Sequence, residues 1–238
     1  MLIDLSHSIR PGMPVYPGDP DTRGPQIMQR IIWGALTFVR HAHYDREGCL
    51  VHAVTLSTHA GTHLDAPAHW LRNGAPVDSP SILAACAGPA RVLDVTRTSE
   101  PGLITPRDLG GTDGGVPELC IHNSGCLCVI GEGDRILLAS GWSERFGCAA
   151  YYEEFPSVSV ELAAILAERR IALLGVETPS LHVSRDEAVH TLLLSAGVVI
   201  VENLANLTRI AGRTVFFAAA PLALEGLDGS PARAFAVI

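Results

Sequence analysis

The stretch His59-Ala-Gly-Thr-His63-Leu-Asp65-Ala-Pro-Ala-His69 places three histidines and one aspartate within eleven residues. Its internal glycine and proline argue against a regular helix, so we expect the polar side chains to come from a loop or an extended segment. In an extended segment His63 and Asp65 project to the same side. Such a cluster is hard to bury without partners, and imidazole nitrogens with a carboxylate oxygen suit zinc, manganese or another divalent cation. The stretch therefore predicts a divalent-metal site at His59, His63 and Asp65.

The composition limits the classes of protein to which the chain can belong. Of its 238 residues, 47% are apolar and 18% are charged, which excludes an extended disordered chain and predicts one domain over residues 1–238. The same apolar content favours buried surface between subunits, and hence a homo-oligomer. The formal net charge is −8 and no basic run occurs, so we expect neither nucleic acid nor an anionic membrane as a partner. With no recognisable export signal or membrane-spanning segment, the cytoplasm is the expected location.

The remaining cysteines and histidines are assigned to ordinary structural roles. Six cysteines are spread along the chain, and without an export signal we expect them to stay reduced. A structural zinc is the alternative for one group, although its spacing is not the usual pair of Cys-x-x-Cys motifs: Cys120, His122, Cys126 and Cys128. The other histidines are expected at the surface or satisfied in the core, namely His7, His41, His43, His52, His122 and His182.

Apolar, β-branched runs indicate strands, and helical spacing indicates two helices. The strands are expected over residues 2–5, 52–56, 90–95, 135–139, 171–176, 198–201 and 214–218. One helix is predicted over residues 160–170. A second begins at Ser184, where Ser184 and Glu187 form a capping-box pattern, and ends at Gly197. Because each helix leads into a strand while turns elsewhere are of hairpin length, the pattern predicts a mixed α/β protein without a purely parallel sheet.

The stretch from His59 to His69 also resembles a known signature. It matches His-x-Gly-Thr-His-x-Asp-x-Pro-x-His at every specified position, the pattern of the cyclase-like metal-dependent hydrolases that include bacterial kynurenine formamidase and isatin hydrolase. Further similar stretches cover most of the chain: Asp4-Leu-Ser-His7, Pro14-Val-Tyr-Pro-Gly-Asp19, Gly133-Asp134, Gly141-Trp142, Leu174-Gly-Val-Glu177-Thr-Pro-Ser180, His190 and Val201-Glu-Asn-Leu204. The resemblance implies a swivelling β/β/α fold with a mixed sheet, a homodimer or homotetramer, and one or two Zn2+ or Mn2+ ions per chain.

The resemblance also assigns metal ligands residue by residue. His59, His63 and Asp65 match the family's first ligand group, in which the aspartate can bridge two metals. His190 and Glu202 match the pair that completes a second metal site in the formamidases. Judged from the residues alone, His190 would equally well be a helix-surface residue and Glu202 a strand-end carboxylate.

The expected activity is hydrolysis of a C–N amide bond in a small carbonyl substrate. A divalent metal supplies hydroxide near neutral pH and polarises a carbonyl, and His69, which matches the family's proton-transfer residue, would pass a proton to the leaving group. By the resemblance, N-formyl-L-kynurenine is the first candidate substrate, which makes an arylformamidase the leading hypothesis. Opening of a cyclic amide, as by isatin hydrolase, or related carbonyl chemistry is the second. A non-catalytic metal-binding protein is the third, although a structural metal needs no proton-transfer residue.

Candidate substrate contacts are aromatic side chains and residues that depart from the family pattern. Tyr16, Trp33 and Trp70 could face an aromatic substrate, although core packing explains them equally well. Glu177 stands where the family commonly has Asp, and His182 also departs from the usual residue. Both departures lie on the expected substrate side, so we predict that they affect specificity.

Overall fold

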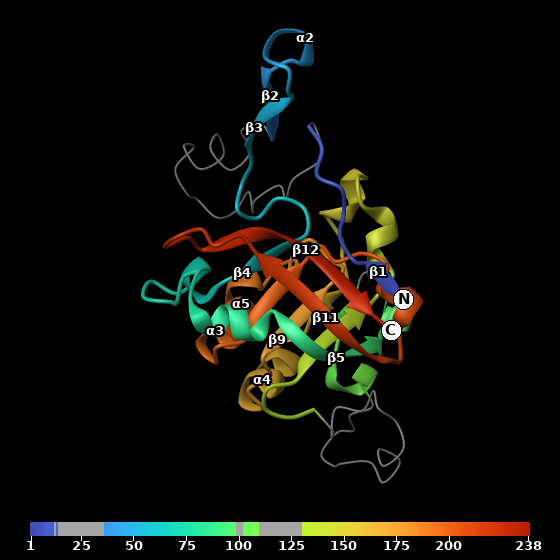
Figure 1. Cartoon of the computed structure of the whole chain (residues 1–238). Coiled ribbons are helices and arrows are strands. Elements are labelled where there is room, and N and C mark those ends of the chain that lie inside the picture. The colour runs from blue at the N-terminus through green and yellow to red at the C-terminus, as the bar shows by residue number, and fades with distance from the viewer. Residues whose placement is uncertain (12, 14–35, 99–101, 110–129) are drawn as a thin grey trace.

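Eight strands form one mixed sheet in the computed structural model, which describes residues 1–11, 13, 36–98, 102–109 and 130–238 (Figure 1). The strands are β1 (Leu2–Asp4), β4 (His63–Asp65), β5 (Ala87–Asp94), β7 (Arg135–Ala139), β9 (Leu173–Val176), β10 (Val199–Glu202), β11 (Thr214–Pro221) and β12 (Gly229–Val237). Their order across the sheet is β1-β12-β11-β5-β7-β9-β10-β4. Because β12 also pairs with β4, the sheet closes on itself into a barrel-like arrangement.

The sheet combines parallel and antiparallel pairs, as the sequence predicts. The neighbours β5, β7, β9 and β10 run parallel, whereas β1, β11 and β12 form antiparallel pairs, and β4 is antiparallel to both of its neighbours. Alternate residues of β7 belong to different cores. Leu137 and Ala139 pack in one core with β11 and β12, while Ile136 and Leu138 pack in the other with two helices. This alternation explains why the central strands are apolar throughout.

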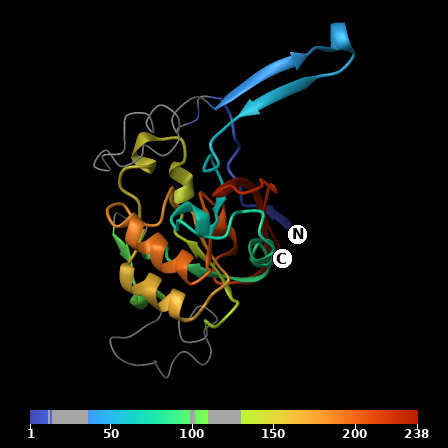
Figure 2. The same cartoon turned by 90° about the vertical axis from the view of Figure 1, so that its left-hand side faces the viewer.

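The two predicted helices cover one face of the sheet. They are α4 (Val160–Glu168) and α5 (Asp186–Ser195), and they lie side by side (Figure 2). Leu162 and Leu166 of α4 and Leu193 of α5 are buried in the core that they share with β7, β9 and β10. Ser159 caps α4, since its hydroxyl accepts the N–H of Leu162 at 3.1 Å. Both helices therefore occur where helical spacing predicts them.

The start of α5 differs from the prediction. The helix begins at Asp186 after an N-cap at Arg185, and no side chain in the described ranges caps it, so the predicted capping box of Ser184 and Glu187 is wrong. Instead, His182 Nδ1 accepts the N–H groups of Ser184 and Arg185, each at 3.1 Å. The imidazole thereby satisfies donors that precede the helix and holds the turn that leads into it. This contact gives His182 a structural role.

Shorter elements connect the main ones. They are α3 (Pro80–Ala85), β6 (Leu103–Ile104), β8 (Ser157–Val158) and the 3-10 turns η1 (Pro67–His69), η2 (Thr96–Thr98), η3 (Pro106–Leu109), η6 (Trp142–Arg145), η7 (Ala149–Tyr151) and η8 (Leu207–Ile210). Strands β6 and β8 form a parallel pair outside the main sheet. Within the described ranges, no helix is both long and apolar enough to cross a membrane.

A separate hairpin projects from the body of the molecule (Figures 1 and 2). It consists of β2 (Thr37–Ala42), the short helix α2 (Tyr44–Glu47) and β3 (Val51–Thr55). The strand predicted over residues 52–56 therefore exists, but it lies outside the main sheet. Apolar side chains on the hairpin are exposed, Val39 to 51% and Val54 to 50%.

Gly74 packs against the turn η1 that carries His69. A Cβ on Gly74 would lie 2.3 Å from the carbonyl carbon of Pro67. The same two segments are joined by a hydrogen bond in which Ala68 N–H donates to the carbonyl oxygen of Ala75 at 3.1 Å. This close approach of two backbone segments leaves no room for a side chain at position 74.

Gly74→Ala is expected to destabilise the fold by about 1–3 kcal/mol, because the added methyl group overlaps backbone that can move only by displacing the turn. Urea unfolding of the wild type and the variant measures the difference. Gly131→Ala is the matched control, since a Cβ there meets nothing within 4 Å. Equal unfolding free energies for Gly74→Ala and the wild type would contradict the packing described.

Candidate metal centre

Strand β4 brings His63 and Asp65 into the interior of the molecule. The strand has three residues; Glu202 of β10 lies opposite His63, and Gly229 of β12 lies opposite Asp65. His63 and Asp65 are two positions apart on an extended strand and share one side of it. Because Glu202 lies directly across from His63, its side chain is on the same face. The pairing therefore brings three of the predicted ligands together.

Two histidines and two carboxylates form a closed ring in this interior. His63 Nε2 lies 3.3 Å from Asp65 Oδ1 and 3.4 Å from Glu202 Oε2. His190 Nε2 lies 3.2 Å from Glu202 Oε1 and 3.6 Å from Asp65 Oδ2. All four residues are buried. Each Nε2 atom faces one oxygen of each carboxylate, so the ring presents nitrogen and oxygen donors of the kind that bind zinc.

The outer nitrogens of these two histidines are already engaged. His63 Nδ1 lies 2.8 Å from the carbonyl oxygen of Gly61, and His190 Nδ1 lies 2.9 Å from the carbonyl oxygen of Asp186. A ring nitrogen that donates to a carbonyl carries a proton, which leaves Nε2 of both rings available as a metal ligand. His190 is 1% exposed, so the alternative of a helix-surface residue is excluded.

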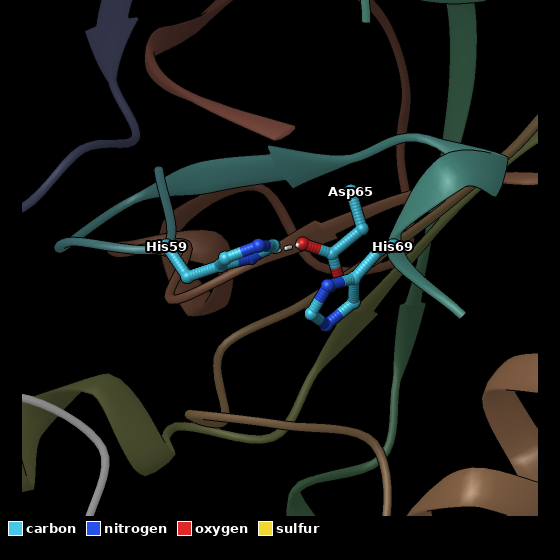
Figure 3. A group of neighbouring side chains, drawn as sticks. All are labelled: His59, Asp65 and His69. Atoms are coloured by element: carbon cyan, nitrogen blue, oxygen red, sulfur yellow. Dashed lines mark hydrogen bonds and ion pairs between the residues drawn. The ribbon is translucent and has the colours of Figure 1, made fainter. Parts of the chain in front are cut away.

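His59 and His69 lie beside the same Asp65 carboxylate (Figure 3). His59 Nδ1 is 2.8 Å from Asp65 Oδ1, and the His59 and His69 ring centroids are 4.0 Å apart. Donor atoms of His59, Asp65 and His69 lie within 4.8 Å of one another, as do those of His63, Asp65 and Glu202. Asp65 belongs to both groups, so the geometry offers two neighbouring cation positions that share this carboxylate. His69 is within reach of the first position, and its role in proton transfer stays a prediction.

The electrostatic balance of the site favours a cation. Burial by itself lowers the pKa of His63, but the Asp65 and Glu202 carboxylates raise it to about 10. Burial likewise opposes ionisation of Asp65, yet the surrounding histidines hold its pKa well below the usual range. Asp65 Oδ2 is buried and has no hydrogen-bond partner among the described residues. A divalent ion would replace the histidine protons and supply the missing partner, so these residues fit a metal site.

Asp228 is a site residue that the sequence patterns did not single out. It lies in the turn before β12, and its Oδ2 is 2.8 Å from His59 Nε2 and 3.4 Å from His69 Nδ1. Hydrogen bonds from His59 and His69 hold the pKa of this carboxyl well below its usual range. A single acidic residue far from the histidine motif carries no signal of its own. Only the pairing of β12 with β4 brings it here.

Glu177 has a different role from the predicted substrate contact. The residue is completely buried. Its Oε2 accepts the N–H of Gly141 at 2.6 Å. Its Oε1 accepts the Ser143 hydroxyl at 2.7 Å and the N–H of Leu207 at 3.1 Å. Because protein donors occupy both oxygens, Glu177 ties together segments of the chain instead of facing a substrate, and the prediction is corrected accordingly.

The predicted aromatic contacts are only partly described. Trp70 follows η1, is 36% exposed, and has its ring centroid 5.4 Å from that of His190. It therefore borders the cluster and stays a candidate substrate contact. Tyr16 and Trp33 lie outside the described residues, as does the possible zinc group within residues 120–128.

Comparison with known proteins places the chain in a family. The family model Cyclase, described as "Putative cyclase", matches residues 3–183. The chain belongs to the Cyclase family. Among curated relatives, kynurenine formamidase from Salinibacter ruber is 30% identical, over 98% of this chain and 95% of the formamidase. The predicted family membership is therefore confirmed.

Solved structures extend the likeness to the fold. Isatin hydrolase A from Ralstonia solanacearum aligns with a TM-score of 0.79 and 28% identity, over 99% of this chain and 91% of that protein. A structure described as a predicted metal-dependent hydrolase from Bacillus stearothermophilus aligns with a TM-score of 0.72 and 26% identity, over 99% of this chain and 97% of that one. These findings confirm the predicted α/β fold with its mixed sheet, and they support a hydrolase of the Cyclase family.

Glu177→Ala is expected to destabilise the folded chain by roughly 2–4 kcal/mol, because it leaves the buried N–H of Leu207 and the partly buried N–H of Gly141 without their acceptor. Urea unfolding measures the loss. Glu132→Ala is the control, since its ion pair with Arg170 spans 3.9 Å at an exposed site and should contribute little. Unchanged stability together with weakened substrate binding in Glu177→Ala would restore the substrate role.

Proposed function

We propose that the chain is a metal-dependent arylformamidase that hydrolyses N-formyl-L-kynurenine to L-kynurenine and formate. One observation carries the proposal: the buried Asp65 carboxylate belongs to two groups of possible cation ligands, and the first of them brings His69 next to His59. The likeness to kynurenine formamidase over nearly the whole chain supports the assignment of the substrate. The bond that breaks is a C–N amide bond other than a peptide bond.

The metal ligands and the proton-transfer residue have separate tasks in this reaction. One or two divalent ions, Zn2+ or Mn2+, are assigned to the side chains of His59, His63, Asp65, His190 and Glu202. When bound, such an ion makes water nucleophilic near neutral pH and polarises a carbonyl group. The ligand side chains are mostly buried, which keeps bulk water away from the ions and strengthens their interactions.

His69 transfers the proton. Its side chain is 27% exposed, so it can contact both the cluster and an incoming substrate. It takes a proton from the attacking water as the C–O bond forms, and it gives that proton to the leaving nitrogen as the C–N bond breaks. Trp70, whose ring lies 5.4 Å from that of His190, offers an aromatic surface for the ring of the substrate.

A cyclic amide is the second candidate substrate, because the same site suits it. One of the structural neighbours, from Ralstonia solanacearum, is named isatin hydrolase. Opening of a cyclic amide needs the same attack by water and the same proton transfer as hydrolysis of a formamide, so the choice depends on the shape of the substrate pocket. A non-catalytic metal-binding protein, the third hypothesis, would have no use for a partly exposed histidine beside the ligands.

Metal content and turnover test the proposal together. Gently purified protein is expected to contain one or two Zn2+ or Mn2+ ions per chain by elemental analysis, and to hydrolyse N-formyl-L-kynurenine. Chelation should abolish turnover, and adding the metal back should restore it, because a histidine without the metal does not make water nucleophilic enough to attack an unactivated amide. Turnover of isatin but not of N-formyl-L-kynurenine would favour the second candidate. Folded protein that binds no metal would overturn the metal site.

His69→Ala is expected to keep its metal and to lose turnover on the order of a hundredfold or more, because only the proton transfer is removed. Elemental analysis and steady-state kinetics on one preparation separate the two effects. Glu161→Ala, at an exposed position of α4, should match the wild type in both. Loss of metal along with activity in His69→Ala would identify His69 as a ligand instead.

We also propose that the chain forms a homodimer or homotetramer through the hairpin of β2 and β3. The hairpin has no further sheet neighbour among the described strands. Phe38 lies opposite Val54 in the pairing, and both are exposed, so they form one continuous apolar patch. A second copy of the chain would cover that patch and stabilise the hairpin.

The double variant Phe38→Glu/Val54→Glu is expected to shift the assembly toward single chains, because two charges would have to be buried at the contact. Light scattering after size-exclusion chromatography measures the mass, and one chain accounts for 25.2 kDa. Leu83→Glu, at an exposed apolar position of α3, is the control and should leave the mass unchanged. A wild type with the mass of one chain would refute the proposed assembly.

A further inference from the structure

We propose that Asp228 is a positioning residue, which determines the nitrogen that His59 offers to the metal and the nitrogen that His69 offers to the substrate. The inference deepens the proposed function and rests on it. Its basis is a single oxygen, Asp228 Oδ2, that lies near both rings.

The contacts of Asp228 Oδ2 define the orientation of each ring. The oxygen is 2.8 Å from His59 Nε2, and since a carboxylate only accepts, this nitrogen carries a proton and donates it. His59 Nδ1 is 2.8 Å from Asp65 Oδ1, one of the candidate metal ligands, so a cation bound to Asp65 would replace the proton on Nδ1 and leave Nε2 donating to Asp228. The same oxygen faces His69 Nδ1 at 3.4 Å and favours a proton there. Nε2 of His69 is then the atom that accepts a proton from water and returns it.

His59 differs from the other two histidine ligands in the way it is held. His63 and His190 each engage Nδ1 with a main-chain carbonyl, so their free atom is Nε2. For His59 the acceptor is the side chain of Asp228, and the engaged atom is Nε2. His59 therefore binds the metal through Nδ1, the opposite nitrogen. The acceptor for His59 is a side chain, which mutation can remove, whereas His63 has a main-chain acceptor. His190 has both the main-chain carbonyl of Asp186 and, at 3.1 Å, the Asp186 carboxylate.

Asp228 is itself held before any metal binds. The Thr58 hydroxyl donates to its Oδ1 at 3.2 Å, and its carbonyl oxygen accepts the N–H of Ala66 at 2.9 Å. The next residue, Gly229, pairs with β4. A Cβ on Gly229 would lie 3.0 Å from Cε1 of His59, so the imidazole packs directly against this turn. The carboxylate and the ring thus have a fixed relative position.

Asp228→Asn is expected to weaken Zn2+ binding by about 10- to 100-fold, because a neutral amide is a weaker acceptor than the carboxylate behind a metal-binding histidine, and mutation of such a partner typically has an effect of that size. It should also lower kcat while leaving KM nearly unchanged, since no group that contacts the substrate is altered. Competition between metal-free protein and a coloured chelator measures the affinity without any substrate. Asp228→Glu, which keeps an acceptor carboxylate, is expected to recover part of both losses.

Asp78→Asn is the matched control for the turn. Asp78 Oδ1 accepts the N–H of Gly226 at 3.1 Å, two residues before Asp228, and Asp78 makes no contact with a site histidine in the described structure. Replacing the Asp78 carboxylate weakens this hydrogen bond in the same turn. Wild-type Zn2+ affinity in Asp78→Asn would therefore show that the effect of Asp228→Asn comes from the Asp228 carboxylate and not from general loosening of the turn.

A crystal structure of the zinc-loaded wild type gives a second readout, in which His59 is expected to bind through Nδ1. Binding through Nε2 would overturn the inference, as would wild-type affinity and kcat in Asp228→Asn. Loss of a whole metal equivalent in Asp228→Asn would also overturn it, because Asp228 would then be a ligand. Neither the affinity nor the ligand atom depends on the substrate, so these results stand apart from whether the chain hydrolyses N-formyl-L-kynurenine.

Discussion

The pairing of β4 on both edges is the constraint on which the site depends. The strand has three residues, and its register is held by β10 on one edge and by β12 on the other. A slip of one residue would turn Asp65 to the opposite face and leave its buried carboxylate without the histidines that stabilise its charge. The closure of the sheet therefore does more than bury apolar surface, because it also brings together candidate metal ligands from distant parts of the chain.

The parts of the fold that could be predicted are those encoded in local patterns. Strand β7 follows from an apolar run and helix α4 from helical spacing, and both occur where they were expected. Of the strands that frame the site, β10 was predicted over residues 198–201, whereas β4 and β12 were missed. Strand β4 is too short and too polar to show the alternation of apolar and polar residues that indicates a strand. Strand β12 contains Pro231, and proline is usually found only in edge strands or irregular segments. Their pairing results from closure of the sheet, which no local pattern reports.

The candidate site, too, could be predicted only in part from the sequence. His63 and Asp65 could be predicted because they are neighbours in an unusual cluster, whereas the roles of Glu177 and Asp228 could not. Both are single acidic residues in turns or loops. The Glu177 carboxylate accepts main-chain N–H groups, whereas the Asp228 carboxylate lies beside two imidazoles. His182, likewise, accepts the N–H groups of Ser184 and Arg185 before α5, where a capping box of Ser184 and Glu187 was expected. Residue type does not determine these roles, because each depends on the donors and acceptors that the fold places nearby.

Closure of the sheet by β12 determines when the candidate site can assemble during synthesis of the chain. During translation the segment with His59, His63 and Asp65 leaves the ribosome long before Glu202 and the turn that contains Asp228. Contacts so distant in sequence form late in folding. At this stage the histidines belong to an unfolded segment. Such a segment would bind whichever available ion, zinc or copper, has the higher affinity for imidazole. If the chain binds a metal as proposed, selection among ions would depend on the completed barrel and not on the histidine motif alone.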